Sequence, residues 1–178
     1  MNKLYPILFA LVLGVSVSAA AVFVAAGDDD DERSFKARLR GYQEIPAIST
    51  GARGTFKAVL SADGTSLSYE LTYSGLSSTV LQAHIHFGQK DVNGGISAWL
   101  CGTAGLPGPA GTPTCPQSGT VSGTIDASDV VGPAGQGIAA GEFAELLAAM
   151  EAGVTYANVH SSMFPGGEIR GQISGGDD

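Results

Sequence analysis

The sequence of 178 residues has little charge, few basic residues, two cysteines and three histidines. Only 15% of the residues are charged, and 9 Lys and Arg stand against 17 Asp and Glu, so the formal net charge is -8. A chain without a basic excess lacks the electrostatic footprint of a nucleic-acid-binding domain, so we predict no nucleic-acid partner. The 26 glycines follow no G-X-Y period, which excludes collagen, and 44% hydrophobic residues exclude a wholly disordered chain. The length is that of one domain with an appendage.

The negative charge is concentrated near the two ends of the chain. Asp28 to Glu32 form one acidic run, and Asp177 and Asp178 close the sequence. The body between these runs has ten acidic and eight basic residues, so its charge is nearly balanced. Consecutive carboxylates lack the alternating spacing of a calcium-binding loop. We therefore interpret residues 27–33 as a solvated acidic linker and residues 175–178 as an acidic tail.

The N-terminal segment from Leu4 to Ala26 contains no charged residue. It is long enough to span a bilayer as a helix. Lys3 precedes it and acidic residues follow it, an arrangement that orients the downstream chain away from the cytoplasm. Its last part contains small-residue sequences that suit a signal-peptidase site. We predict that residues 1–26 are a signal peptide or an uncleaved membrane anchor, and that the protein is exported to the periplasm or the extracellular space.

The two cysteines agree with an exported protein. Cys101 and Cys115 enclose 13 residues, seven of which are Gly or Pro, so this loop has little intrinsic structure. The two cysteines could also be free thiols or a pair of metal ligands, but an oxidising compartment favours a disulfide. We predict a Cys101–Cys115 disulfide, which would restrict the loop in the unfolded chain.

The body of the sequence, residues 34–174, shows repeated two-residue alternation of apolar and polar side chains, which is typical of half-buried β-strands. An Asp-Gly turn at residues 62–65 joins two of the alternating segments as a hairpin. We predict an all-β, antiparallel β-sandwich or barrel. The eight predicted strands comprise residues 35–40, 56–60, 66–73, 80–88, 96–101, 119–125, 155–160 and 167–173.

One segment near the C-terminus has a helical period instead. Phe143, Leu146, Leu147 and Met150 recur at helical spacing and form one apolar face. Gly153 is placed to end the helix. We predict one short helix between residues 142 and 152, and interpret its apolar stripe as core packing rather than as a site.

Two of the three histidines lie on the predicted strand at residues 80–88. Gln82, His84 and His86 occupy one parity, and apolar residues occupy the other. Residues two apart on a strand point to the same face, so the two imidazoles project together from the side away from the core. A His-x-His pair can bind one transition metal ion, although histidines without a ligand would also explain the pattern.

The third histidine lies in the next predicted hairpin. Asn158 and His160 share the polar parity of one strand, and Glu168 and Arg170 share that of the following strand. If this hairpin lies beside the His84/His86 strand, three imidazoles, a carboxylate and a guanidinium share one polar face. We consider two interpretations: a structural network in which Glu168 and Arg170 form an ion pair or cap loops, and a metal or anion site.

Four motifs in this order resemble the CHRD domain family, which is named for chordin and also occurs in exported bacterial proteins. They cover residues 35–174 and lie at residues 41–46 (GYQEIP), 83–88 (AHIHFG), 158–160 (NVH) and 165–171 (PGGEIRG). The resemblance implies an immunoglobulin-like sandwich or barrel and no established enzymatic activity. The growth-factor-binding modules of chordin are missing here, so that role does not transfer.

The same residues are distantly similar to copper/zinc superoxide dismutases. His84, His86, His160 and Arg170 match the His-x-His strand, the later Val-His and the arginine of the copper half. This chain has no fourth histidine for copper and no zinc loop, but three imidazoles suit Cu(II) or Zn(II) with one open position.

These observations leave two functional hypotheses. The first is a non-enzymatic exported module that binds an extracytoplasmic protein or a small ligand. The second is a copper- or zinc-binding redox protein, similar to superoxide dismutase, in which His84, His86 and His160 bind the metal. In this second hypothesis Arg170 steers an anion and Glu168, Asn158 and Gln82 support the ligands. Gln43, Glu44 and Pro46 are expected to form a bulge and turn, or part of a partner surface.

Overall fold

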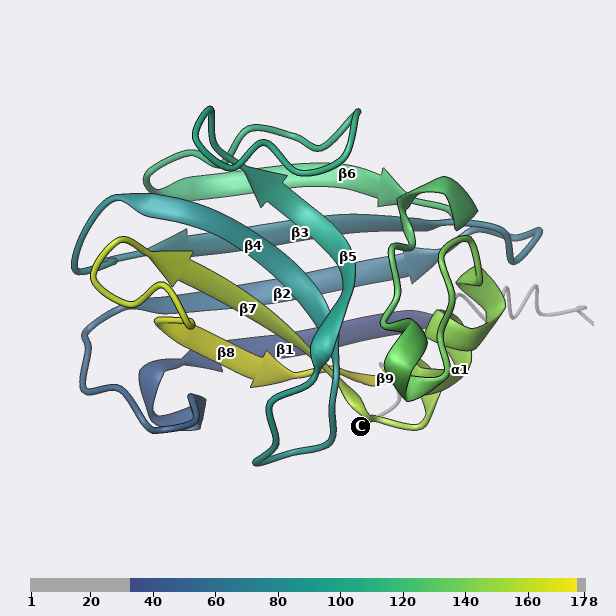
Figure 1. The fold of residues 1–178 in the computed structure, drawn as a ribbon, viewed down its shortest axis with the longest axis horizontal. Coiled ribbons are helices and arrows are strands. Elements are labelled where there is room, and N and C mark those ends of the chain that lie inside the picture. Colours follow the sequence, from purple (N-terminus) through teal and green to yellow (C-terminus); the bar gives the residue numbers. More distant parts are fainter. Residues whose placement is uncertain (1–32, 176–178) are drawn as a thin grey trace, which may run out of the picture. The chain divides into compact units, whose positions relative to one another are not determined.

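A single antiparallel sheet, rolled into a nearly closed barrel, forms the domain (Figure 1). The structure, a computed structural model, describes residues 33–175. Hydrogen-bonded neighbours follow the order β5-β4-β7-β8-β1-β2-β3-β6, and the short β9 pairs with β1. In Figure 1 the strands β4, β5 and β7 cross in front of the strands behind them, and β8 lies beside its neighbour β1. The predicted all-β class is confirmed.

The elements follow the predicted segments closely. The strands are β1 (Ser34–Arg40), β2 (Arg53–Leu60), β3 (Leu67–Ser74), β4 (Val80–Phe87), β5 (Gly95–Gly102), β6 (Gly119–Ile125), β7 (Thr155–Ser161), β8 (Ile169–Gln172) and β9 (Ser174–Gly175). One α-helix, α1 (Phe143–Glu151), and three 3₁₀ turns, η1 (Gly41–Gln43), η2 (Ala127–Asp129) and η3 (Ala134–Gln136), complete the described part. Strand β9 was not predicted, because two residues are too few to show an alternation.

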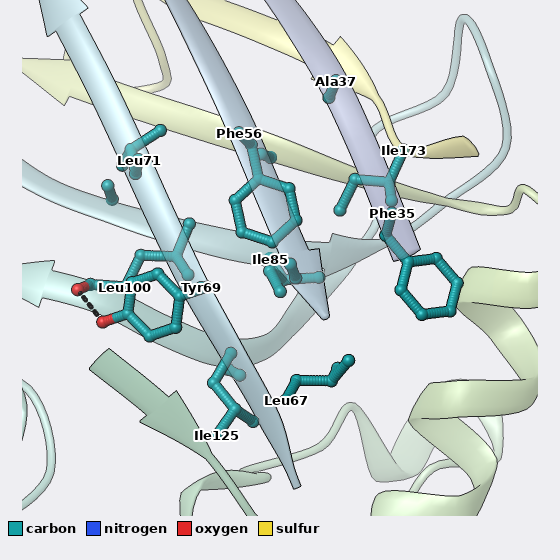
Figure 2. Close-up of a cluster of buried hydrophobic side chains, with 14 of the residues drawn as sticks. Phe35, Ala37, Phe56, Leu67, Tyr69, Leu71, Ile85, Leu100, Ile125 and Ile173 are labelled. Carbon is teal, nitrogen blue, oxygen red and sulfur yellow. Dashed lines mark hydrogen bonds between the residues drawn. The ribbon is translucent and has the colours of Figure 1, made fainter. Parts of the chain in front are cut away.

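The core consists of the inward-facing residues of the alternating strands (Figure 2). Phe56 on β2, Leu71 on β3 and Ile85 on β4 have no solvent exposure. Tyr69 reaches across this core from β3, and its hydroxyl donates to the Leu100 carbonyl on β5 at 2.6 Å. The buried phenol therefore finds an acceptor, and burial raises the pKa of Tyr69 to about 12.

The predicted helix covers one end of the sheet's interior. Phe143, Leu146 and Met150 are buried against the core, and Leu147 packs at its edge. Gly153 follows the helix with φ of 67°, a left-handed conformation that glycine adopts without a Cβ clash. The helix thus serves packing, as the apolar stripe predicts.

The two ends of the chain lie outside the described residues. The predicted signal or anchor at residues 1–26, nearly all of the acidic linker, and Gly176 to Asp178 of the acidic tail belong to this part. Within residues 33–175, no helix has both the length and the apolar character needed to cross a membrane.

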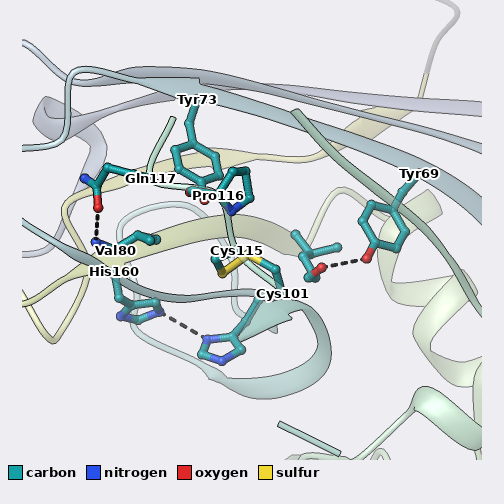
Figure 3. The surroundings of a disulfide bond; sticks show 10 residues. Tyr69, Tyr73, Val80, Cys101, Cys115, Pro116, Gln117 and His160 are labelled. Atoms are coloured by element: carbon teal, nitrogen blue, oxygen red, sulfur yellow. Dashed lines mark hydrogen bonds between the residues drawn. A yellow bond between two sulfur atoms is a disulfide. The ribbon is translucent and has the colours of Figure 1, made fainter. Parts of the chain in front are cut away.

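Cys101 and Cys115 form the predicted disulfide, which joins the end of β5 to the chain before β6 (Figure 3). The loop between them packs against β5: a Cβ on Gly108 would lie 2.7 Å from the Trp99 ring. Gly108 has φ of 69°, so both its conformation and this close approach require glycine. The disulfide therefore holds a loop that covers Trp99.

Replacing both cysteines by alanine is expected to lower the free energy of unfolding by about 3 kcal/mol. Without the cross-link, the unfolded chain regains the conformational entropy that closing a loop of this length removes. Urea unfolding of the oxidised protein and of the Cys101→Ala/Cys115→Ala variant measures the difference. A loss below about 1 kcal/mol would show that the loop is held by its packing rather than by the cross-link.

Candidate metal centre

The three histidines meet because β4 and β7 are paired antiparallel neighbours. In their register His84 lies opposite Asn158, and Gln82 lies opposite His160. Directly opposite residues on antiparallel strands project to the same face, so His84, His86 and His160 share one face. The hairpin that carries His160 therefore does lie beside the strand that carries His84 and His86.

The imidazole nitrogens are close enough to surround one small ion. His84 Nδ1 lies 3.1 Å from His160 Nε2. One nitrogen from each of the three rings can be chosen so that all lie within 4.8 Å of one another. Two nitrogens bound to one tetrahedral zinc ion would be about 3.3 Å apart, given Zn–N distances of about 2.0–2.1 Å. His84 Nδ1 and His160 Nε2 are already near this spacing.

The face that carries the histidines lies away from the core, as predicted, but it is buried. The exposed fractions are 0% for His84, 8% for His86 and 5% for His160. Strand parity correctly predicted the direction of the side chains, but loops pack over this outer face of the sheet. Gly94 of the β4–β5 loop and Pro165 of the β7–β8 loop contact two of the rings.

Backbone carbonyls determine which nitrogen carries the proton on two of the rings. His86 Nδ1 donates to the Gly94 carbonyl at 3.0 Å, and His160 Nδ1 donates to the Pro165 carbonyl at 2.9 Å. Their Nε2 atoms therefore carry lone pairs in the neutral rings. His84 Nδ1 then donates to His160 Nε2. The Nε2 atoms of His84 and His86 are buried without a partner among the described residues.

Burial keeps the three imidazoles neutral. Desolvation lowers the pKa of His84 to about 2, with the neighbouring His160 and His86 acting in the same direction. Desolvation also lowers the pKa of His86 and of His160 to about 4, although hydrogen bonds to Gly94 and Pro165 oppose the shift. Neutral imidazole is the form that binds a metal ion.

Aromatic rings form the walls beside the histidines. Tyr156 stacks on His86 with ring centroids 4.8 Å apart, and its hydroxyl accepts from the Gly94 amide at 3.2 Å. Trp99 contacts His84 edge-on, with centroids 4.3 Å apart. Because the disulfide-closed loop packs on Trp99, it supports the position of the His84 ring indirectly.

A buried ion pair between Glu44 and Arg170 closes the site on the β8 side. Arg170 Nε donates to Glu44 Oε2 at 2.7 Å, and both side chains are almost fully buried. Asn158 Nδ2 donates to Glu44 Oε1 at 2.6 Å. Burial raises the pKa of Glu44, while Arg170 acts against this shift. The guanidinium also donates to Asn93 at 2.6 Å and lies 4.4 Å from the centre of the Tyr156 ring.

This ion pair decides between alternatives that the sequence left open. Glu168 is not the partner of Arg170, and Glu44 lies in the predicted turn between β1 and β2 but directs its side chain into the site rather than to an outer partner surface. Sequence reasoning missed Glu44 because it precedes the histidine motif by 40 residues in a segment without alternation. The signal that could have found it is Arg170 itself, since a guanidinium on a buried strand requires a carboxylate.

Gly167 makes this arrangement sterically possible. A Cβ at this position would lie 2.6 Å from Asn158 Nδ2 and 2.7 Å from Glu44 Oε1. Its φ is 131°, which side chains rarely adopt. A larger residue here would separate Glu44 from Asn158.

Glu168 caps loops, which is one of the structural roles predicted for it, whereas Gln82 does not take the role predicted for it beside the histidines. Glu168 is buried, and its Oε1 accepts from the Ser77 amide, the Ser77 hydroxyl and the Thr50 hydroxyl at 2.7–2.8 Å. Burial raises the pKa of Glu168, but hydrogen bonds from Ser161, Thr50 and Ser77 outweigh it and the net shift is downward. Glu168 thus caps two loops. Gln82 is half-buried opposite His160 and takes part in none of the hydrogen bonds described for the site.

These features define an all-β barrel domain with a buried three-histidine cluster, supported by loop carbonyls and a buried ion pair. The CHRD domain family model matches residues 35–173, so the chain belongs to the CHRD domain family. No curated protein and no solved structure matches the chain in the comparisons made. The four motifs that carry the family resemblance supply His84, His86, His160, Glu44, Arg170 and the carbonyl of Pro165, and so converge on this cluster.

The metal-free protein is expected to lose stability as the pH falls from about 6.5 to about 4. The pKa values of His86 and His160 are about 4 in the folded chain and 6.5 in the reference state. Below 6.5 the unfolded chain therefore binds protons that the folded chain does not, so stability is complete above 6.5 and decreases below it. Urea unfolding at several pH values in the presence of a chelator measures the slope of the free energy of unfolding against pH.

His86→Gln should reduce the slope, because it removes one of the titrating groups. A free energy of unfolding that stays constant over this range would contradict the burial of neutral imidazoles.

Glu44→Gln is expected to cost about 3 kcal/mol of stability, because it leaves the Arg170 charge buried without a carboxylate. The exposed Arg33–Glu151 ion pair provides the control, and Glu151→Gln should cost less than about 1 kcal/mol. Denaturant unfolding of both variants at neutral pH compares them. Equal losses would show that the buried pair has no special structural role.

Proposed function

We propose that this chain is an exported, non-enzymatic module that binds one copper or zinc ion through His84, His86 and His160. The observation that carries the proposal is the meeting of three buried, neutral imidazoles whose nitrogens lie within 4.8 Å of one another. Imidazole is a ligand that suits both copper and zinc. Three protein ligands leave one coordination position for water or another small ligand.

Hydrogen bonds to the outer nitrogens support this proposal. A metal-binding histidine usually donates its other N–H to a carbonyl or carboxylate, which orients the ring and fixes its tautomer. His86 and His160 both do so, toward Gly94 and Pro165. The buried Nε2 of His86 has no partner among the described residues, and such an atom carries a desolvation cost that an ion would remove.

His84 would change its tautomer when the site binds an ion. In the metal-free chain its Nδ1 proton points to His160 Nε2, 3.1 Å away. If this proton moved to His84 Nε2, His84 Nδ1 would carry a lone pair. Both His84 Nδ1 and His160 Nε2 could then bind the same ion. This change would place the proton on His84 Nε2, which has no partner among the described residues.

The surroundings favour binding over catalysis. The ligand rings are at most 8% exposed, which restricts access to an ion between them. The Arg170 side chain is already engaged by Glu44, Asn93 and Tyr156, and is not free to steer an anion. A redox enzyme similar to superoxide dismutase is the alternative function at the same residues. It requires substrate access, which dismutase activity of the copper-loaded protein would reveal.

Export is part of the proposal. The Cys101–Cys115 disulfide suits an oxidising compartment, and the apolar segment at residues 4–26 suits a signal or anchor. The partner would then be an extracytoplasmic protein or a small ligand, and contact with a membrane would occur only through an uncleaved N-terminal segment.

Titration of the metal-free protein with Cu(II) and with Zn(II) tests the binding site. We expect one equivalent to bind, with a nitrogen-ligated EPR spectrum for Cu(II). Free metal at about 100 times its Kd should raise the free energy of unfolding by about 2.7 kcal/mol. Chelation should reverse this gain.

The variants His86→Gln and His160→Gln should lose the EPR signature and most of the stabilisation, whereas Gln89→Ala on the neighbouring loop should retain both. Circular dichroism checks that each variant is folded. Binding that is weak, or that is unchanged in both histidine variants, would refute the metal site.

A further inference from the structure

Five of the nine Lys and Arg residues of this acidic chain lie on the outer face of two adjacent strands. All five side chains are exposed, and they alternate with core residues along β1 and β2. The basic face consists of Lys36, Arg38, Arg40, Arg53 and Lys57.

The register of β1 and β2 places like charges directly opposite each other. Lys36 pairs with Lys57, and Arg40 pairs with Arg53. Like charges in directly opposite positions destabilise a sheet, so the placement of Arg40 opposite Arg53 does not serve stability. Glu70 lies opposite Lys57 on β3, but among residues 33–175 no ion pair within 4.0 Å involves Arg38, Arg40 or Arg53.

The basic face is hollowed into a groove. One hollow of about 540 Å³ is lined by Lys36, Arg38 and Lys57, and a second of about 370 Å³ by Arg38, Arg40 and Arg53. Arg38 and Thr55 line both hollows, which therefore lie next to each other. Hydroxyl and amide groups of Thr72, Ser74, Gln172 and Ser174 form the edges. The groove thus combines positive charge with neutral hydrogen-bonding groups.

We propose that this groove binds a linear anionic polysaccharide, whose carboxylates or sulfates pair with the cations and whose hydroxyls contact the polar edges. Cations recur along β1 at every second residue, about 7 Å apart, and so match a polymer with repeated charges. The large exposed apolar residues of the described part, which a membrane surface would use, lie outside β1, β2 and β3. The proposal is independent of the metal site, because no histidine lines the groove.

Binding of a fluorescent heparin dodecasaccharide to the full chain tests the proposal. We expect binding at about 0.15 M NaCl that weakens steeply as salt is added, because charge pairs are screened and counterions are released. The variant Arg38→Gln/Arg53→Gln should bind about tenfold more weakly or worse. The control Arg33→Gln/Lys90→Gln removes the same charge elsewhere on the surface and should stay within about threefold of the wild type.

A stability measurement separates a binding role from a structural one. Arg53→Glu places a carboxylate opposite Arg40, so the thermal unfolding midpoint should stay the same or rise while heparin binding falls. If the variant binds heparin as well as the wild type, the groove is not the site and the proposal fails.

Competition identifies the class of ligand. Two competitors are added separately to the complex of the protein with the dodecasaccharide: vesicles of phosphatidylcholine with phosphatidylglycerol, and double-stranded DNA. Each is added in an amount that carries the same total negative charge as the dodecasaccharide. Weak competition by both supports the polysaccharide, and equal competition by either overturns it. A chain that binds heparin only after Asp28 to Asp31 are changed to asparagine would show that its own acidic segment occupies the groove, which also overturns the proposal.

Discussion

The antiparallel pairing of β4 with β7 is the constraint on which the rest of the site depends. This register aligns His84 with Asn158, and the pairing of β7 with β8 aligns Asn158 with Arg170. One row across three strands thus joins the histidine cluster to the buried ion pair. A shift by one residue would turn every one of these side chains toward the core. The apolar residues on the other face, such as Ile85 and Val159, therefore hold the polar site in register.

The outer face of this part of the sheet is unusual because it is polar and nevertheless buried. A buried polar group must find partners, and here each loop that covers the face supplies one. The β4–β5 loop offers the Gly94 carbonyl, the β7–β8 loop offers the Pro165 carbonyl, and the segment after η1 offers Glu44. The loops and the site stabilise each other.

Much of this arrangement was predictable from single residues and their spacing. Alternation at Phe35, Ala37 and Leu39 predicted a strand with one buried face, and the spacing of Phe143, Leu146 and Met150 predicted the helix. The parity of His84 and His86 predicted that both rings share a face. Glu44 and the true partners of Glu168 were not predictable in this way, because no local period relates them to the residues they contact. Metal binding itself stays a prediction.

The sequence alone determined the local geometry of the chain: which side chains share a face, where a strand or helix runs, and which cysteines are available to pair. These properties follow from the period of two residues in a strand and of 3.6 residues in a helix, and these periods can be read from residues that are close together in the sequence. Only the tertiary structure decided that the histidine face is covered, that Arg170 pairs with Glu44, and that Arg40 faces Arg53. Those outcomes depend on contacts between segments far apart in sequence, whose register is set by the packing of the whole sheet.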